Sequence, residues 1–201
     1  MDAITLKAYS DNADRLITSY TTMKPRRLYE LIATFFHRSA RTLDVGCGSG
    51  RDLAYLQGAG FKIEGIDAVP EFIAHVKKTS PSIPVHLDEL PKLKTIPDNS
   101  FENVLVSAVL MHLPGEALVE ATKNLIRITA KGGRLIVSVK KRLGPRSERD
   151  DLGRLFTDIQ PWALKLLFES QGAELLFHEE QPDESREDTR WDNFVFERKL
   201  D

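Results

Sequence analysis

Short runs of β-branched and aliphatic residues alternate with amphipathic stretches through the middle of the chain. The runs predict five strands, at Thr42–Val45, Lys62–Ile66, Val85–Leu87, Asn103–Ser107 and Arg134–Val139. Apolar positions at helical spacing between them predict three helices, at Gly50–Gln57, Glu71–Lys78 and Gly115–Ile128. Strands that alternate with helices are typical of right-handed crossovers. We therefore expect an α/β fold, with a mostly parallel sheet and helices on both of its faces.

The two ends of the chain follow other patterns. Helical spacing runs from about Asp11 to Arg38, but Pro25 interrupts it, so two helices are predicted there. Near the other end, a helix is predicted from about Asp158 to Ser170. Two strand-like runs follow it, Glu174–Phe177 and Asn193–Glu197, with a charged stretch between them. They predict a hairpin that closes one side of the sheet.

Composition limits the possible classes. The chain has 201 residues, 41% hydrophobic and 29% charged, as in an ordinary globular protein. Its net charge of -2 argues against binding nucleic acid or an anionic membrane through bulk charge, although local basic patches remain compatible with it. Without repeats or Gly/Ser linkers, we expect one domain over 1–201, with N-terminal helices in 1–39, an alternating core in 40–140 and a C-terminal helix and strand pair in 141–201.

Targeting and metal signals are weak in this sequence. The single cysteine, Cys47, excludes a disulfide within the chain and a cysteine-rich metal site. The histidines show no paired spacing, so no metal is predicted. The first ten residues lack a signal pattern, and no apolar run approaches the ~18 residues of a membrane span. We therefore expect a cytoplasmic protein that does not bind a membrane.

The most informative segment is a glycine turn, Gly46-Cys47-Gly48-Ser49-Gly50, between a predicted strand and a predicted helix. Glycine permits positive φ and close approach of a ligand, and the helix start favours an anion. A Walker loop needs a lysine that is absent here, and a dinucleotide turn has glycine at the sixth position, where this chain has Arg51. The spacing suits S-adenosylmethionine (SAM), which has no pyrophosphate, although a purely structural turn is the alternative.

An acidic residue follows at the expected distance. Asp67 ends the second predicted strand, 21 positions after Gly46. A carboxylate there is placed to accept both ribose hydroxyls of an adenosine. The alternative is that Asp67 caps the helix that follows.

Four segments, in order along the chain, resemble the motifs of the class I SAM-dependent methyltransferases. They are Leu43–Leu53, Gly65–Asp67, Ser100–Ser107 and Arg127–Val137. The resemblance covers about residues 40–139, and the nearest subgroup is small bacterial-type proteins of uncertain substrate. It implies a Rossmann-like fold with a mostly parallel seven-stranded sheet and a C-terminal antiparallel hairpin. It also implies SAM as the methyl donor, S-adenosylhomocysteine (SAH) as the product, and the helices of 1–39 as a lid.

The resemblance also implies which residues contact the cofactor. Asp67 would hold the ribose, and Asp88 and Glu89 would lie near the adenine amine. Arg51 would reach the SAM carboxylate or lie on the helix surface, and Cys47 in the turn would pack rather than react. The full set of cofactor residues that we expect is Asp44, Gly46, Cys47, Gly48, Arg51, Asp67, Ala68, Asp88, Glu89 and Ser107.

His112 is the candidate general base. It follows the fourth predicted strand, at the edge where open α/β sheets bind ligands, and an imidazole titrates near neutrality. Capping of the next helix or simple packing are the alternatives. Candidates to contact the acceptor, each with packing or surface exposure as the alternative role, are Tyr9, Tyr20, Arg26, Lys140 and Trp191.

A basic stretch follows the fifth predicted strand and fits either an anionic acceptor, including tRNA, or a solvated loop. It comprises Lys140, Lys141, Arg142, Arg146, Arg149 and Arg154. The leading hypothesis is a small-molecule methyltransferase. The alternatives are an RNA (tRNA) or protein methyltransferase, and a SAM- or SAH-binding protein without turnover. The sequence identifies neither the acceptor nor an oligomeric state.

Overall fold

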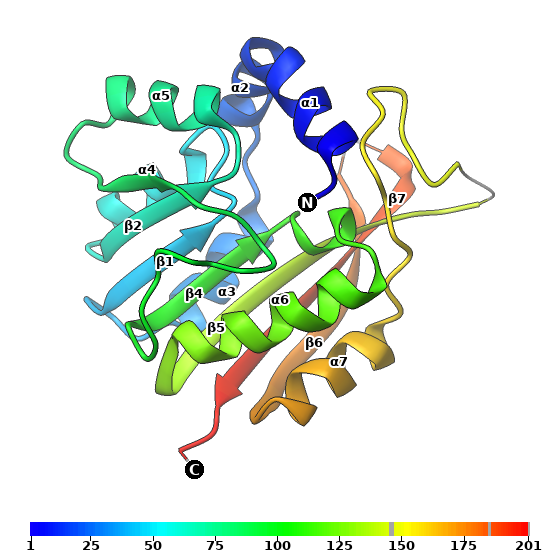
Figure 1. Ribbon diagram of the computed structural model, residues 1–201. Helices are drawn as coiled ribbons and strands as arrows, with labels where there is room; N and C mark the ends of the chain where they lie inside the picture. The colour runs from blue at the N-terminus through cyan, green and yellow to red at the C-terminus, as the bar shows by residue number, and fades with distance from the viewer. Residues whose placement is uncertain (145–146, 185, 201) are drawn as a thin grey trace.

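A computed structural model describes residues 1–144, 147–184 and 186–200, so Arg146 of the basic stretch lies outside the described residues. Seven strands form one sheet in the order β3-β2-β1-β4-β5-β7-β6 (Figure 1). Strands β1 to β5 pair in parallel, whereas β7 runs antiparallel to both β5 and β6. The strands are β1 (Arg41–Val45), β2 (Lys62–Asp67), β3 (Val85–Leu87), β4 (Phe101–Ser107), β5 (Thr129–Arg142), β6 (Ala173–Asp183) and β7 (Arg186–Arg198). This confirms the predicted α/β class and the antiparallel C-terminal pair.

Helices cover both faces of the sheet. The alternating side chains of β4 reach both layers of helices. Leu105 packs with one group of helices, and Val104 and Val106 pack with the other. The first face holds α3 (Arg26–Phe35), α4 (Arg51–Gly58) and α5 (Pro70–Thr79). The second holds α6 (Gly115–Ile128) and α7 (Pro161–Ser170), which lie in front of the sheet in Figure 1. The sheet is therefore buried on both sides.

The N-terminal region contains three helices rather than the two predicted. Pro25 separates α2 (Ala13–Thr22) from α3 as expected, but α1 (Ala3–Asp11) was missed. Its start is fixed by the Asp2 carboxylate, which accepts hydrogen bonds from the amides of Ile4 and Thr5. The helix has little apolar periodicity, because it buries the polar Thr5 beside small or aromatic residues. In Figure 1, α1 and α2 lie at the end of the sheet where β1 and β4 terminate.

The C-terminal hairpin is longer than predicted. β6 and β7 extend through most of the charged stretch, and β7 pairs along β5 as far as Arg142 with Thr189. Polar side chains are tolerated because β6 alternates between half-buried and exposed positions along its length. α7 begins at Pro161, three residues later than predicted, since proline suits the first helical position.

Two features are absent from the part of the chain that the structure describes. No helix there is long and apolar enough to cross a membrane. No group of three or more histidine, cysteine or acidic side chains is placed to hold a metal ion within residues 1–144, 147–184 and 186–200.

Candidate active site

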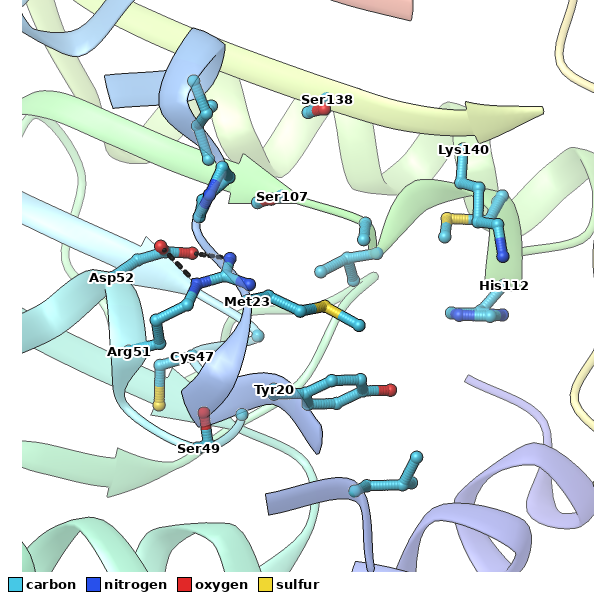
Figure 2. Close-up of a pocket in the computed structure, with 18 of the residues that line it drawn as sticks. Tyr20, Met23, Cys47, Ser49, Arg51, Asp52, Ser107, His112, Ser138 and Lys140 are labelled. Atoms are coloured by element: carbon cyan, nitrogen blue, oxygen red, sulfur yellow. Dashed lines mark hydrogen bonds and ion pairs between the residues drawn. The ribbon is translucent and has the colours of Figure 1, made fainter. Parts of the chain in front are cut away.

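A cavity of about 630 Å³ opens at the carboxyl ends of the central strands (Figure 2). Its wall includes residues of α1 and α2, of the glycine turn and of the β6–β7 hairpin. Asp44 is buried within β1 and does not line it. The other predicted site residues all do: Tyr9, Tyr20, Arg26, Gly46, Cys47, Gly48, Arg51, Asp67, Ala68, Asp88, Glu89, Ser107, His112, Lys140 and Trp191.

The glycine turn is held against β2 by its own backbone. The amides of Gly46 and Cys47 both donate to the carbonyl of Ile66, at 2.8 and 2.9 Å. Gly46 has φ +77°, and a Cβ added there would lie 2.5 Å from a methyl group of Val109. At Gly48, with φ +52°, an added Cβ would meet only the ring of Tyr20, 3.7 Å away. Gly46 is thus required for packing, whereas Gly48 faces the cavity.

Asp67 joins the turn to the next helix. Its Oδ2 accepts from the amide of Gly48 at 2.8 Å, and its Oδ1 accepts from the amide of Val69 at 2.9 Å. An ionised carboxylate has about four acceptor sites, so two remain for a ligand. Asp67 does not cap α5 as the alternative predicted, because Val69 is the N-cap residue of that helix and no side chain caps it; the bond to the Val69 amide leaves room for a ribose contact. Burial raises the pKa of Asp67 to about 6, although these hydrogen bonds oppose the shift.

Two further acids, Asp44 and Asp52, belong to the same group of charges as Asp67. Asp44 is buried, and its Oδ2 has no hydrogen-bond partner among the described residues. Burial raises the pKa of Asp44, and the carboxylates of Asp52 and Asp67 add to the shift. Arg51 lies over Asp52 and donates from Nε at 2.9 Å and from Nη2 at 2.6 Å. Arg51 is therefore at the cavity wall but already paired.

Asp88 organises the loop after β3. Its carboxylate accepts from the amides of Glu89, Lys94 and Thr95 and from the Thr95 hydroxyl, at 2.6–3.2 Å. Burial opposes ionisation, but these hydrogen bonds outweigh it and lower the pKa of Asp88. The Asp88 carboxylate thus fixes the shape of the cavity wall, and Glu89 beside it is exposed.

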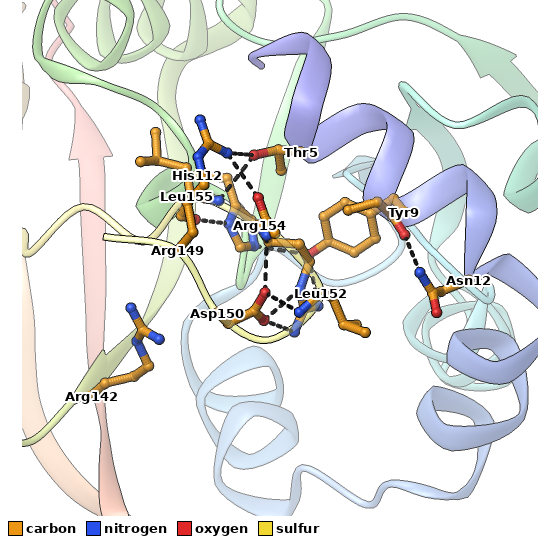
Figure 3. Close-up of polar contacts among 12 residues, drawn as sticks. Thr5, Tyr9, Asn12, His112, Arg142, Arg149, Asp150, Leu152, Arg154 and Leu155 are labelled. Carbon is orange, nitrogen blue, oxygen red and sulfur yellow. Dashed lines mark hydrogen bonds and ion pairs between the residues drawn. The ribbon is translucent and has the colours of Figure 1, made fainter. Parts of the chain in front are cut away.

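His112 has a defined tautomer (Figure 3). Its Nδ1 lies 2.5 Å from the carbonyl oxygen of Leu155, which only accepts, so Nδ1 carries the proton. Its Nε2 then accepts from the Tyr9 hydroxyl, at 2.8 Å. The side chain is buried, and burial lowers the pKa of His112 to about 4, helped by the charges of Arg154 and Lys140. His112 is thus a neutral hydrogen-bond acceptor over the physiological range.

Arg154 connects this pair to the N-terminal helices α1 and α2. It donates to the hydroxyl of Tyr9 at 3.3 Å and to that of Tyr20 at 3.1 Å, while Asp150 accepts from its other nitrogens at 2.6–2.9 Å. The sequence pattern identifies Arg154 only as part of the basic stretch and gives no sign of the Leu155 carbonyl. A backbone carbonyl has no sequence signal, and the two tyrosine partners of Arg154 lie more than 130 positions away.

Lys140 and His112 lie at the end of the cavity away from Arg51 and Asp52, and Tyr20 lies between them and the glycine turn (Figure 2). Trp191 pairs with Lys140 across β5 and β7, and its Nε1 donates to Asp183 at 2.8 Å. Trp191 therefore lies on the hairpin and borders the cavity at the same time.

Comparison with known proteins agrees with this geometry. The sequence profile described as "Methyltransferase domain" matches residues 43–137. A ubiquinone biosynthesis O-methyltransferase of Xanthomonas oryzae pv. oryzae is 28% identical over 60% of this chain and 51% of its own length. A tRNA U34 carboxymethyltransferase of Colwellia psychrerythraea is 35% identical over 47% of this chain and 30% of its own length. The chain thus spans about half the length of the first of these relatives and less of the second.

The fold has solved counterparts. A 1,6-didemethyltoxoflavin-N1-methyltransferase of Burkholderia thailandensis, crystallised with 1,6-didemethyltoxoflavin and SAH, superimposes with a TM-score of 0.81. The alignment covers 98% of this chain and 88% of that one, at 18% identity, so it concerns the fold alone. Together, the ordered motifs, the strand order 3-2-1-4-5-7-6 and the profile match place residues 43–137 in the class I SAM-dependent methyltransferase family.

Proposed function

We propose that this chain binds SAM and transfers its methyl group to a small-molecule acceptor. The observation that carries the proposal is the shared cavity. Gly48 and Asp67 line one part of it, and the paired side chains of Tyr9 and His112 line another. A cofactor held by Gly48 and Asp67 would have its reactive methyl group on the side of the cavity where Tyr9 and His112 lie. The whole of 1–201 would act as one domain, with 1–39 as the lid.

The residues present fit this cofactor. Asp67 keeps two acceptor sites for the ribose hydroxyls, and Gly48 leaves room for close approach. Ala68, Asp88 and Glu89 would border the adenine. The remaining residues that we assign to the methionine part or to the support of the turn are Asp44, Gly46, Cys47, Arg51 and Ser107. SAM itself supplies an electrophilic methyl group on a positively charged sulfur, so the chain has to align the acceptor and exclude water.

Tyr9 and His112 would handle the proton when the acceptor has one to lose. The Tyr9 oxygen donates to His112 and accepts from Arg154, which leaves one acceptor position for the substrate. When bound, SAM would supply the methyl group, and the electron pair of its S–CH3 bond would stay on sulfur to give SAH. The Tyr9 oxygen would take the acceptor's proton while the phenolic proton passes to Nε2 of His112. The protein would need no covalent intermediate for this transfer.

A small molecule is favoured over tRNA by the state of the basic stretch. Arg149 pairs with Asp2 at 3.1 Å, and Arg154 pairs with Asp150 at 2.6 Å. Lys141 faces Glu180 at 3.8 Å. Cations that already have partners release fewer counterions on binding a polyanion, so they contribute less to RNA affinity. The tRNA-modifying relative keeps RNA as the second candidate.

Calorimetry with SAM and SAH tests the first part of the proposal, and absence of binding to both compounds refutes it. Release of SAH is then measured across a panel of metabolites and tRNA. Acceptor-dependent release with a metabolite supports the proposed enzyme. Binding without release from any acceptor indicates a sensor, whereas an affinity for tRNA that falls steeply with salt favours the second candidate.

A further inference from the structure

Among the residues that the structure describes, one ammonium group at the acceptor end of the cavity has no counterion. It belongs to Lys140, which lies on β5 and lines the cavity, half-buried. Within the described ranges, no carboxylate pairs with it and no hydrogen bond from Nζ is formed; the Phe156 ring centre lies 5.7 Å from Nζ. The next residue, Lys141, does not line the cavity and faces Glu180. Two adjacent lysines thus have opposite environments.

The charges around Lys140 are mostly positive. Arg186 on β7, Arg142 on β5 and Arg154 in the loop before α7 act on it, and only Asp183 on β6 acts in the opposite direction. His112, which also faces it, is neutral. Burial, followed by Arg186 and Arg154, lowers the pKa of Lys140 to about 8. A half-buried cation among other cations gains free energy when an anion binds beside it.

The His112 imidazole gives an independent reason to expect an acidic ligand. Its Nε2 is the accepting nitrogen of a fixed tautomer, receives the hydrogen bond from the Tyr9 hydroxyl, and belongs to a side chain that lines the same cavity. A base accepts a proton efficiently only from a group of comparable acidity. An imidazole kept neutral by burial is a weak base, so it suits an acceptor whose own O–H or N–H is acidic.

We propose that the methyl acceptor is a small organic acid, and that its ionised group binds to the ammonium of Lys140. This inference rests on the proposed function. The atom that receives the methyl group would then lie toward Tyr9 and His112, beside the ionised group. A polyanion such as tRNA is the competing occupant, and the test below distinguishes it.

The test uses SAH-loaded protein and matched pairs of probes. Salicylate, benzoate and 4-hydroxybenzoate are each compared with the corresponding neutral amide by calorimetry at pH 7. At least one carboxylate is expected to bind at least tenfold more tightly than its amide. Lys140→Gln is expected to remove that preference, while Lys141→Gln, the same charge change one residue away, keeps it.

The pH dependence provides a second readout. Carboxylate affinity should fall as the pH rises from 7 to 9, because Lys140 loses its charge there, and the slope should disappear in Lys140→Gln. SAH affinity should be equal in the wild type, Lys140→Gln and Lys141→Gln. If SAH does not bind to any of them, the proposed function is refuted, and not the assignment of Lys140. The inference is overturned if no carboxylate binds better than its amide, or if Lys140→Gln retains the preference. Binding of tRNA that depends on Lys140, without carboxylate binding, also overturns it.

Discussion

The hydroxyl oxygen of Tyr9 lies 2.8 Å from Nε2 of His112, although the two residues are 103 positions apart in the chain. Their rings meet edge to face, with centres 5.5 Å apart. Because Nδ1 of His112 donates to Leu155, the hydrogen bond runs from Tyr9 to His112 and not the reverse. One contact therefore joins α1 to the segment after β4.

Removing either member of this pair should reduce turnover while leaving cofactor binding intact. Tyr9→Phe deletes the hydroxyl, and His112→Asn keeps a donor for Leu155 but deletes the acceptor at Nε2. We expect acceptor-dependent SAH release to fall about 10²–10⁴-fold in each, the usual contribution of a general base. Tyr55→Phe is the control, since Tyr55 stacks on Tyr29 and does not line the cavity. Undiminished turnover in His112→Asn would exclude a proton-accepting role.

Burial of neutral His112 should make stability depend on pH. Its folded pKa of about 4 is below the unfolded value of 6.5, so the unfolded chain binds more protons between these values. The stability present above pH 6.5 is therefore lost as the pH falls toward 4, by roughly 3 kcal/mol in total. Urea unfolding at several pH values, on the wild type and on His112→Asn, measures it.

The difference between these two proteins isolates the histidine. Asp67 acts in the opposite direction, because its pKa is raised to about 6, but both proteins retain it. A pH-independent difference in the free energy of unfolding would contradict the prediction.

Asp67 should control cofactor affinity and its pH dependence. A ribose hydroxyl donates to the ionised carboxylate, so SAH affinity should decline below about pH 6, by up to tenfold per unit. Asp67→Asn should weaken SAH binding about 10- to 100-fold, the scale of a hydrogen bond to a charged group, and remove this slope. Glu120→Gln is the comparison, because Glu120 is exposed on α6 and does not line the cavity. An Asp67→Asn protein that binds SAH normally is the result that rejects the ribose assignment.

Two glycines of the turn and one at the end of α4 should respond differently to alanine. Gly46→Ala adds a methyl group 2.5 Å from Val109 at a φ of +77°, so it should destabilise the fold by about 1–3 kcal/mol or more. Gly48→Ala carries backbone strain at a φ of +52° but meets no such clash, so it should destabilise the fold less than Gly46→Ala and weaken SAH binding. Gly58→Ala, on α4 in open space, should change stability by less than about 1 kcal/mol. Thermal unfolding with and without SAH separates loss of fold stability from loss of SAH binding. Equal stability losses in Gly46→Ala and Gly48→Ala would contradict the predicted difference between the two glycines.

The errors in the predicted fold have physical causes. α1 was missed because it lies among other elements and buries Thr5 with Ala8 and Tyr9, so no apolar stripe marks it. The hairpin was predicted too short because β6 and β7 carry polar residues at positions that are only half covered. A periodic pattern of apolar residues appears when an element buries one continuous apolar face. Neither α1 nor the outer part of the β6–β7 hairpin has such a face.

The sequence by itself determined the parts of this protein that depend on neighbours in the chain. The strand, glycine turn and helix around Gly48 are contiguous, and the strand that carries Asp67 lies beside them, so local patterns were sufficient to predict the family and to identify residues that line this part of the cavity. Only the tertiary structure decided the part around Tyr9, His112 and Lys140. The direction of the Tyr9–His112 hydrogen bond and the charges around Lys140 depend on elements far apart in sequence. No local pattern encodes such contacts, because each is set by how α1, the sheet and the loop before α7 pack together.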